Sequence, residues 1–147
     1  MPERQQFSTF LVDGLFFGVE VEKVQEVLRY QQMTRVPLAS PVVRGLINLR
    51  GQIVTALDLR RRLDLSERPD GQVPMNVVIR TDDGGVSLLV DEIGDVVEVD
   101  ESTFERPPDT LKSSARAVIR GVHKLNGRLM HVLDTEKVVN QDSEGKR

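Results

Sequence analysis

One stretch of this chain occurs twice, and that duplication restricts the folds open to it more than any other feature. Residues 44–58 align without a gap on residues 120–134, with Arg-Gly, leucine, glycine and aspartate recurring at matching places. A weaker repeat precedes it, since residues 21–27 resemble residues 90–96. The two repeated segments occur in the same order in both halves, which indicates that one small unit has been used twice. Two copies are fewer than an open solenoid needs, so the sequence predicts two like halves packed together.

The length of the chain determines how those halves relate. The chain has 147 residues, and a half of about 70 residues has only a marginal core of its own. We therefore expect the halves to share a hydrophobic seam. The segment 66–74 is rich in proline, glycine and charge and is predicted to separate approximate halves at 7–68 and 74–139, with strand exchange allowed at their ends. Residues 140–147 are polar and are predicted to form a mobile tail.

Short runs of valine, isoleucine and leucine are separated by turn signals, which indicates strands. Asp13-Gly14, the segment 81–85 and Asn126-Gly127 each suit the tip of a hairpin, because glycine tolerates the positive φ of such turns. About ten short strands with only fragments of helix predict an all-β protein, either small barrels or a sandwich. The helical fragments are expected at 20–28, 41–46, 59–63, 118–122 and 135–139, with Asp58 as the cap of the third. The first overlaps the segment 26–37, whose composition favours extended chain.

Composition excludes several classes of function. The net charge is −3 with acids and bases interspersed, so the basic face needed for duplex nucleic acid is absent. There is no polybasic run for anionic lipid, and tryptophan, the best stacking platform for single strands, is missing. Cysteine is also absent, which removes disulfides and thiolate metal sites. No run approaches about 18 apolar residues. We therefore expect a cytoplasmic protein that does not insert into a membrane.

The residues offer little chemistry for an enzyme. His123 and His131 lie eight positions apart across a hairpin, but no third metal ligand is apparent in the sequence. Nucleophile elbows, phosphate loops and dinucleotide fingerprints are not found. We therefore predict no catalytic residue, no metal and no cofactor. One alternative stays open, namely a small ligand-binding or hydrolytic β-barrel that uses the two histidines and nearby acids.

Two arginine features invite a functional interpretation. Arg60, Arg61 and Arg62 form a cationic cluster, which we interpret as a solvated helical turn whose stems cover apolar surface. Arg50 precedes a glycine at a turn, whereas the second copy has Asn126 there. The turn therefore does not require arginine, and both a partner contact and an interdomain hydrogen bond remain open for its planar guanidinium.

Several segments together resemble the CheW-like family of chemotaxis coupling proteins. The resemblance covers nearly all of residues 7–139, and the run Gly-x-x-Asn-Leu-Arg-Gly, followed by a strand and Asp-Leu-Arg, is specific. One departure is visible, since many relatives have proline where this chain has Thr55. Threonine fits a strand well, so the departure bears on partner choice rather than on the fold. The segments that carry the resemblance are 21–27, 34–37, 44–54, 57–60, 89–93 and 125–139.

The resemblance implies a single CheW-like domain of two packed five-stranded SH3-like β-barrels, and no catalysis. Proteins of this family are adaptors that join the cytoplasmic tips of methyl-accepting chemotaxis receptors to the regulatory domain of the histidine kinase CheA. The chain would then be cytoplasmic and reach membrane receptor arrays through its partners. An adaptor of the same kind in another kinase pathway, such as pilus-based motility, is the alternative. By the same analogy receptor helices dock in the groove between the barrels, near positions matched by Val24, Glu26, Gly45, Asn48 and Arg50.

Overall fold

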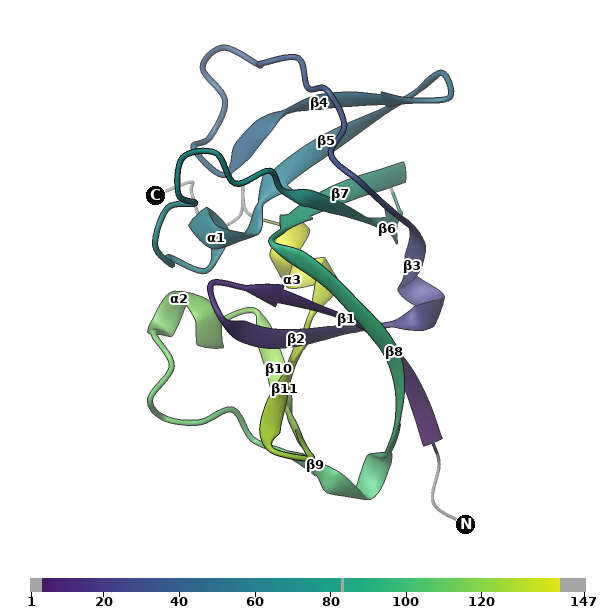
Figure 1. Ribbon diagram of the computed structural model, residues 1–147, viewed down its shortest axis with the longest axis vertical. Helices are drawn as coiled ribbons and strands as arrows, with labels where there is room; N and C mark the ends of the chain where they lie inside the picture. The colour runs from purple at the N-terminus through teal and green to yellow at the C-terminus, as the bar shows by residue number, and fades with distance from the viewer. Residues whose placement is uncertain (1–3, 83, 141–147) are drawn as a thin grey trace.

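The chain forms two β-sheets that meet at a common core (Figure 1). The computed structural model describes residues 4–82 and 84–140. Strands dominate, and the helices are single turns or little more. The prediction of an all-β protein with fragments of helix is confirmed. The mobile tail predicted for 140–147 lies, apart from Asn140, outside the described residues.

One sheet has six strands in the order β8-β1-β2-β11-β10-β9, and the other has five in the order β3-β6-β7-β5-β4. The strands of the six-stranded sheet are β1 (Arg4–Val12), β2 (Leu15–Glu20), β8 (Glu92–Asp100), β9 (Phe104–Glu105), β10 (Ile119–Leu125) and β11 (Arg128–Leu133). Those of the five-stranded sheet are β3 (Val24–Leu28), β4 (Val43–Leu49), β5 (Gln52–Asp58), β6 (Met75–Thr81) and β7 (Gly84–Val90). The helical turns are η1 (Val21–Lys23), α1 (Leu59–Arg62), η2 (Glu101–Thr103), α2 (Ser113–Arg116) and α3 (Thr135–Val139).

The two copies of the repeat have exchanged their first hairpins. Each copy contributes a hairpin, a single strand, a second hairpin and a helical turn, in that order. The hairpin β1–β2 joins β8, β10 and β11 of the second copy, whereas β6–β7 joins β3, β4 and β5 of the first. The junctions are equivalent, because β2 runs parallel to β11 and β7 runs parallel to β5. The division of the chain between the two sheets therefore differs from the predicted halves 7–68 and 74–139. Those halves describe the sequence repeat and remain a prediction.

Each sheet curls so that the chain leaving one edge reaches the opposite edge. After β3, Thr34 forms a two-bond bridge with Leu46 of β4, with N···O distances of 2.9 and 2.8 Å. After β8, the chain turns through η2 and pairs as β9 with β10. Gly45 lies at the first seam, where an added Cβ would approach the Thr34 carbonyl oxygen to 2.7 Å. Gly121, its counterpart in the second copy, has the same role against Phe104 and Glu105. The recurring Arg-Gly is therefore explained by curling, which gives each sheet its barrel-like shape.

The largest hydrophobic cluster draws on both sheets, which confirms the expected seam. Phe10 and Phe17 of one sheet are fully buried in it with Leu88 of the other and with Val138 of α3. Each sheet also encloses a smaller cluster of its own. Figure 1 shows α3, in yellow, at the level where the two sheets meet. The smaller clusters are Ile47, Leu49, Val54, Ala56, Val78 and Leu89 in one sheet, and Phe7, Phe16, Val99, Met130 and Val132 in the other.

The aspartates that recur at the end of each copy cap the helical turns. Asp58 accepts a hydrogen bond from the Arg60 backbone N–H at 3.1 Å, as predicted, and Asp134 accepts one from the Lys137 N–H at 3.2 Å. Three expectations of helix need correction. Helix covers only 21–23 of the segment 20–28, Val43 begins a strand within 41–46, and Ile119 begins a strand within 118–122. Pairing with β6, β5 and β11 satisfies the backbone groups of these strands.

Candidate functional site

The predicted site residues all belong to the five-stranded sheet, and the structure brings two of them together at its surface. Val24 and Glu26 lie on the edge strand β3, while Gly45 and Asn48 lie on β4, at the opposite edge. Arg50 follows in the β4–β5 turn and forms an ion pair with Glu26, so the pair connects the two edges. The Arg50 side chain is 70% exposed and that of Glu26 22% exposed. The Arg50 guanidinium therefore remains accessible to a partner.

The β4–β5 turn holds Arg50 in a conformation that arginine seldom adopts. Arg50 has φ +53° and Gly51 has φ +89°, both in the left-handed region where glycine and asparagine are favoured. The Asn48 side chain stabilises the turn by accepting a hydrogen bond from the Gly51 N–H at 2.8 Å. Retaining arginine at such a position costs about 1 kcal/mol or more, which favours a role for its side chain.

The other two predicted residues have structural surroundings. Gly45 is buried at the seam with Thr34 and presents no side chain. Val24 is half-buried against the shared core, and its carbonyl accepts a hydrogen bond from Arg80 Nη1 at 2.8 Å. Val24 and Gly45 can therefore influence a binding surface mainly by positioning the strands around it.

A groove of about 650 Å³ lies between the five-stranded sheet and α3 of the second copy. Its apolar lining includes Ile53 of β5, Val86 of β7 and Val139 of α3. Charged residues at η1, β6 and α3 flank this strip, and Thr55 faces the same groove. Ile53 is 58% exposed, an unusual position for isoleucine in a strand. The charged residues are Glu22, Lys23, Arg80, Asp82 and Glu136.

The resemblance led us to expect a groove between the two halves, but none of the five predicted residues lines this one. One signal for its actual lining was present in the sequence. In β5, Val54 and Ala56 are buried while Ile53 and Thr55 point to the other face. An isoleucine on the outward face of a half-buried strand departs from the usual polar alternation. That departure makes Ile53 a candidate for a contact with a partner. By contrast, α3 is far from β5 in sequence, and only the exchanged topology places Val139 beside it.

The arginine run 60–62 forms the expected helical turn, but only Arg61 is solvated as we expected, with a side chain 41% exposed. Arg60 and Arg62 are 5% and 6% exposed, because α1 packs into the seam between the sheets. Arg62 donates to the carbonyls of Lys137 and Val138 at 2.8 and 3.1 Å. These acceptors are the final carbonyls of α3, which lack partners within the helix. The Arg62 side chain therefore joins the helical turns of the two copies.

Asp91 is the centre of a buried ionic cluster at the same seam. It accepts hydrogen bonds from the Arg60 side chain, from Arg68 Nη2 at 3.2 Å and from the Asp13 backbone N–H at 2.7 Å. Burial disfavours the charged carboxylate, but these hydrogen bonds and the two guanidinium charges outweigh it and lower the pKa of Asp91. The hydrogen bond with Asp91 likewise raises the pKa of Arg60.

The two histidines lie on opposite faces of their hairpin and are used in packing. His123 pairs with Met130 and His131 with Val122, so their side chains alternate in direction. His123 stacks obliquely on Phe7 and Phe104, with Nδ1 2.7 Å from Thr103 Oγ1, whereas His131 Nδ1 lies 2.9 Å from the Phe16 carbonyl. Burial lowers the pKa of His123. Within residues 4–82 and 84–140, no three side chains of the ligand types gather as a metal site would require, and no helix is long and apolar enough to cross a membrane.

Comparisons with known proteins agree with this geometry. A family model described as the CheW-like domain matches residues 6–143. Chemotaxis protein CheW of Bacillus subtilis is 32% identical over 139 residues, which cover 95% of this chain and 89% of that protein. Chemotaxis protein CheW of Thermotoga maritima is 28% identical over 133 residues, covering 90% and 86%. Protein PilI of Pseudomonas aeruginosa is 27% identical over 113 residues, covering 77% of this chain and 64% of PilI.

A solved structure supports the fold independently. The crystal structure of the scaffolding protein TtCheW from Thermoanaerobacter tengcongensis superposes with a TM-score of 0.79. The match covers 90% of this chain and 89% of that one, at 24% sequence identity. The exchanged pair of β-sheets is therefore an architecture already seen in a crystal.

Proposed function

This chain belongs to the CheW-like domain family, whose members are non-catalytic adaptors, and we propose that it couples chemotaxis receptors to the histidine kinase CheA. The groove between the five-stranded sheet and α3 carries the proposal. Its strip of Ile53, Val86 and Val139, flanked by charges of both signs, suits one face of an amphipathic helix. The cytoplasmic tip of a receptor offers such helices, so we assign the groove to the receptor.

The predicted site residues extend this surface along β3 and the β4–β5 turn. Residues 22 and 23 line the groove. Glu26 follows on the same edge of the sheet and pairs with Arg50 of the β4–β5 turn. We propose that Glu26 and Arg50 contact the receptor directly. Asn48 holds the turn that presents Arg50, while Val24 and Gly45 position the two edge strands.

The kinase would occupy a different surface, so that one rigid fold holds both partners. Each contact can be weak, because tethering many adaptors in an array raises the effective concentration of every component. In this proposal the protein resides in the cytoplasm and is recruited to membrane receptor arrays only through its partners.

A second candidate pathway is favoured by one comparison, the similarity to PilI of Pseudomonas aeruginosa. An adaptor of this kind could serve a kinase of pilus-based motility instead of flagellar chemotaxis. The two proposed pathways share the fold and the groove. They differ in which histidine kinase of the cell binds to the adaptor and is purified with it.

Co-sedimentation tests the proposal. A receptor signalling fragment displayed on vesicles is mixed with CheA and this protein, and each component is omitted in turn. We expect CheA in the pellet only when all three are present. Replacing Ile53 with serine should reduce sedimentation of the adaptor, whereas Val73→Ser, at a valine of similar exposure (57%) outside the groove, should not. Sedimentation of CheA without the adaptor would contradict the coupling role.

A further inference from the structure

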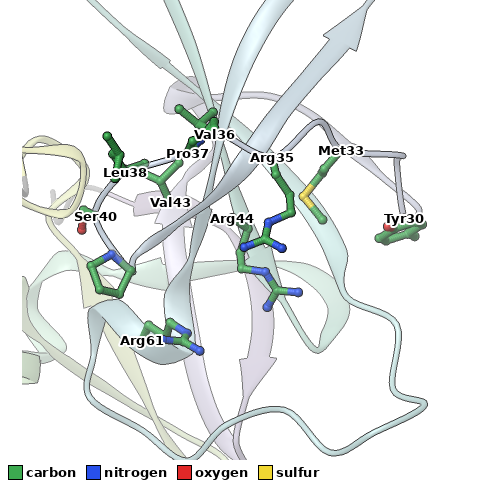
Figure 2. A pocket seen from close by; sticks show the side chains of 12 residues that line it. Tyr30, Met33, Arg35, Val36, Pro37, Leu38, Ser40, Val43, Arg44 and Arg61 are labelled. Atoms are coloured by element: carbon green, nitrogen blue, oxygen red, sulfur yellow. The ribbon is translucent and has the colours of Figure 1, made fainter.

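A second hollow lies under the long connection between β3 and β4. It has a volume of about 570 Å³ and shares no lining residue with the groove described above. Residues 30–41 form most of it, Val43 and Arg44 of β4 add one wall, and Arg61 of α1 adds another. Figure 2 shows the side chains that surround this space, which we call the loop cavity.

The charge of the loop cavity has a single sign. Its lining contains Arg35, Arg44 and Arg61 and no acidic residue, in a chain whose net charge is −3. Arg44 and Arg61 share the buried Asp58, at 3.2 and 3.8 Å, and Arg61 also pairs with Glu67 at 3.2 Å. The Arg44 and Arg61 side chains nevertheless remain 44% and 41% exposed. In the described part of the chain Arg35 forms no ion pair. Guanidinium donors therefore remain available for an added carboxylate.

The loop also exposes two aliphatic side chains and a tyrosine beside these arginines. Leu38 is fully exposed, Val36 is 37% exposed and Tyr30 is 46% exposed. Leu38 has φ +66°, a backbone conformation that costs a leucine about 1–3 kcal/mol. Neither hydrophobic burial nor backbone preference favours a leucine there, whereas a contact with another molecule would bury its side chain.

We propose that the loop cavity docks an acidic segment of a partner protein that carries a bulky aliphatic side chain beside its carboxylates. The carboxylates would pair with the planar guanidinium groups of Arg35 and Arg44, and the aliphatic group would cover Leu38 and Val36. A peptide is favoured over a bilayer because the arginines line a hollow. This surface does not overlap the groove, so the proposal stands whether or not the groove binds a receptor.

Phage display of random peptides of about twelve residues, selected on the full-length chain, tests the proposal. We expect enriched peptides with at least two acidic residues and a leucine-like residue. Their binding should weaken about tenfold or more on Leu38→Ser or Arg35→Glu. Val73→Ser and Arg29→Glu are matched controls at exposed positions outside the cavity and should leave binding unchanged. Because Leu38 and Arg35 are exposed, their variants should melt like the parent protein.

Four results would overturn the assignment. The first is a selection without clones sensitive to both Leu38→Ser and Arg35→Glu, and the second is a set of sensitive clones that lack acidic residues. Sedimentation with phosphatidylserine vesicles that is lost on Leu38→Ser would assign the loop to a lipid surface. Self-association that is lost on Leu38→Ser would assign it to a second copy of this chain.

Discussion

The Arg60 guanidinium donates hydrogen bonds to both carboxylate oxygens of Asp91, with Nε 3.1 Å from Oδ1 and Nη2 2.6 Å from Oδ2. Arg60 belongs to α1 of the first copy, and Asp91 directly follows β7 of the second. Asp91 also holds the β1–β2 turn through the Asp13 N–H. Both side chains are more than nine-tenths buried. The Arg60–Asp91 ion pair thus connects α1 to the end of the β6–β7 hairpin and, through Asp91, to the β1–β2 hairpin at the seam.

Replacing Asp91 with asparagine should lower the free energy of unfolding by about 3 kcal/mol, because the buried Arg60 and Arg68 would lose their nearest counter-charge. Of their ion pairs in the described part of the chain, only the longer contacts of 3.6 Å to Asp13 and 3.8 Å to Asp58 would remain. Urea unfolding monitored by circular dichroism measures the change. Asp70→Asn is the control, since Asp70 is exposed. An equal, small effect of both substitutions would show that the Asp91 cluster adds little.

The same pair predicts how stability responds to acid. The folded-state pKa of Asp91 is lowered, so its contribution is fully present above the ordinary aspartate pKa of about 3.9. It is lost as the pH falls from there through the lowered value. We therefore expect the parent protein to lose more stability than Asp91→Asn below about pH 4. Parallel stability curves for the two proteins would contradict this.

Gly45 to alanine should open the seam at which the five-stranded sheet curls. The new Cβ would approach the Thr34 oxygen to 2.7 Å, so the bridge to Leu46 has to shift, at about 1–3 kcal/mol. Hydrogen exchange at the Leu46 amide, which donates to Thr34, should accelerate. Gly85→Ala is the control, because its Cβ would meet only ordinary contacts of 3.5 Å and longer. Unchanged protection at Leu46 would refute the structural role of Gly45.

The Glu26–Arg50 pair can be separated into its structural and binding roles. Arg50→Glu should abolish co-sedimentation with receptor and kinase while changing the melting temperature little, because exposed ion pairs contribute about 1 kcal/mol or less. Exchanging the two charges, as Glu26→Arg with Arg50→Glu, restores the pair but not the charge presented to a partner. We expect the exchanged protein to remain defective in co-sedimentation. Recovery of co-sedimentation would mean that the Glu26–Arg50 pair serves only to stabilise the two edges of the sheet.

The repeat made much of the fold predictable. The matching positions of Gly45 and Gly121 and of Asp58 and Asp134 predict equivalent structural roles, and the structure confirms them. Strand exchange was allowed for at the ends of the halves, but the sequence could not tell that whole hairpins are exchanged. Alternation tells which face of a strand is buried but not which sheet the strand joins. Both assignments of β1–β2 would bury the same side chains, and their choice depends on packing across the whole molecule.

The site was less predictable than the fold, for a related reason. Glu26 and Arg50 were named from a resemblance, but their pairing depends on how far the sheet curls. Arg62 looked solvated because its acceptors, the last carbonyls of α3, lie about half the chain away. Leu38 lies in a turn over residues 36–39, which the Ala39 N–H closes by donating to the Val36 carbonyl at 3.3 Å. Pro37 suits the position before a residue of positive φ, but nothing in the sequence pattern signals an exposed leucine there. Whether a charged or apolar side chain in this chain is buried, paired or exposed is decided by tertiary contacts.

His123 should make stability depend on pH near neutrality. It is 1% exposed between Phe7 and Phe104, and burial lowers its pKa, only partly opposed by the charge of Glu101. The folded chain therefore favours the neutral ring, whereas the unfolded chain takes up a proton as the pH falls below about 6.5. The contribution of His123 is fully present above that pH and declines below it.

Stability measured at about pH 7.5 and about pH 5.5 checks this expectation for His123→Phe, which keeps an aromatic ring and removes the titration. The parent protein should lose more stability between the two pH values than the variant. Thr103→Val is the control, because it removes the 2.7 Å hydrogen bond to Nδ1 but leaves the imidazole in place. It should lower stability by a similar amount at both pH values and keep most of the parent's pH dependence. If His123→Phe and the parent lose equal stability on acidification, the ring does not have to stay neutral in the fold, and the pH dependence arises from the carboxylates instead.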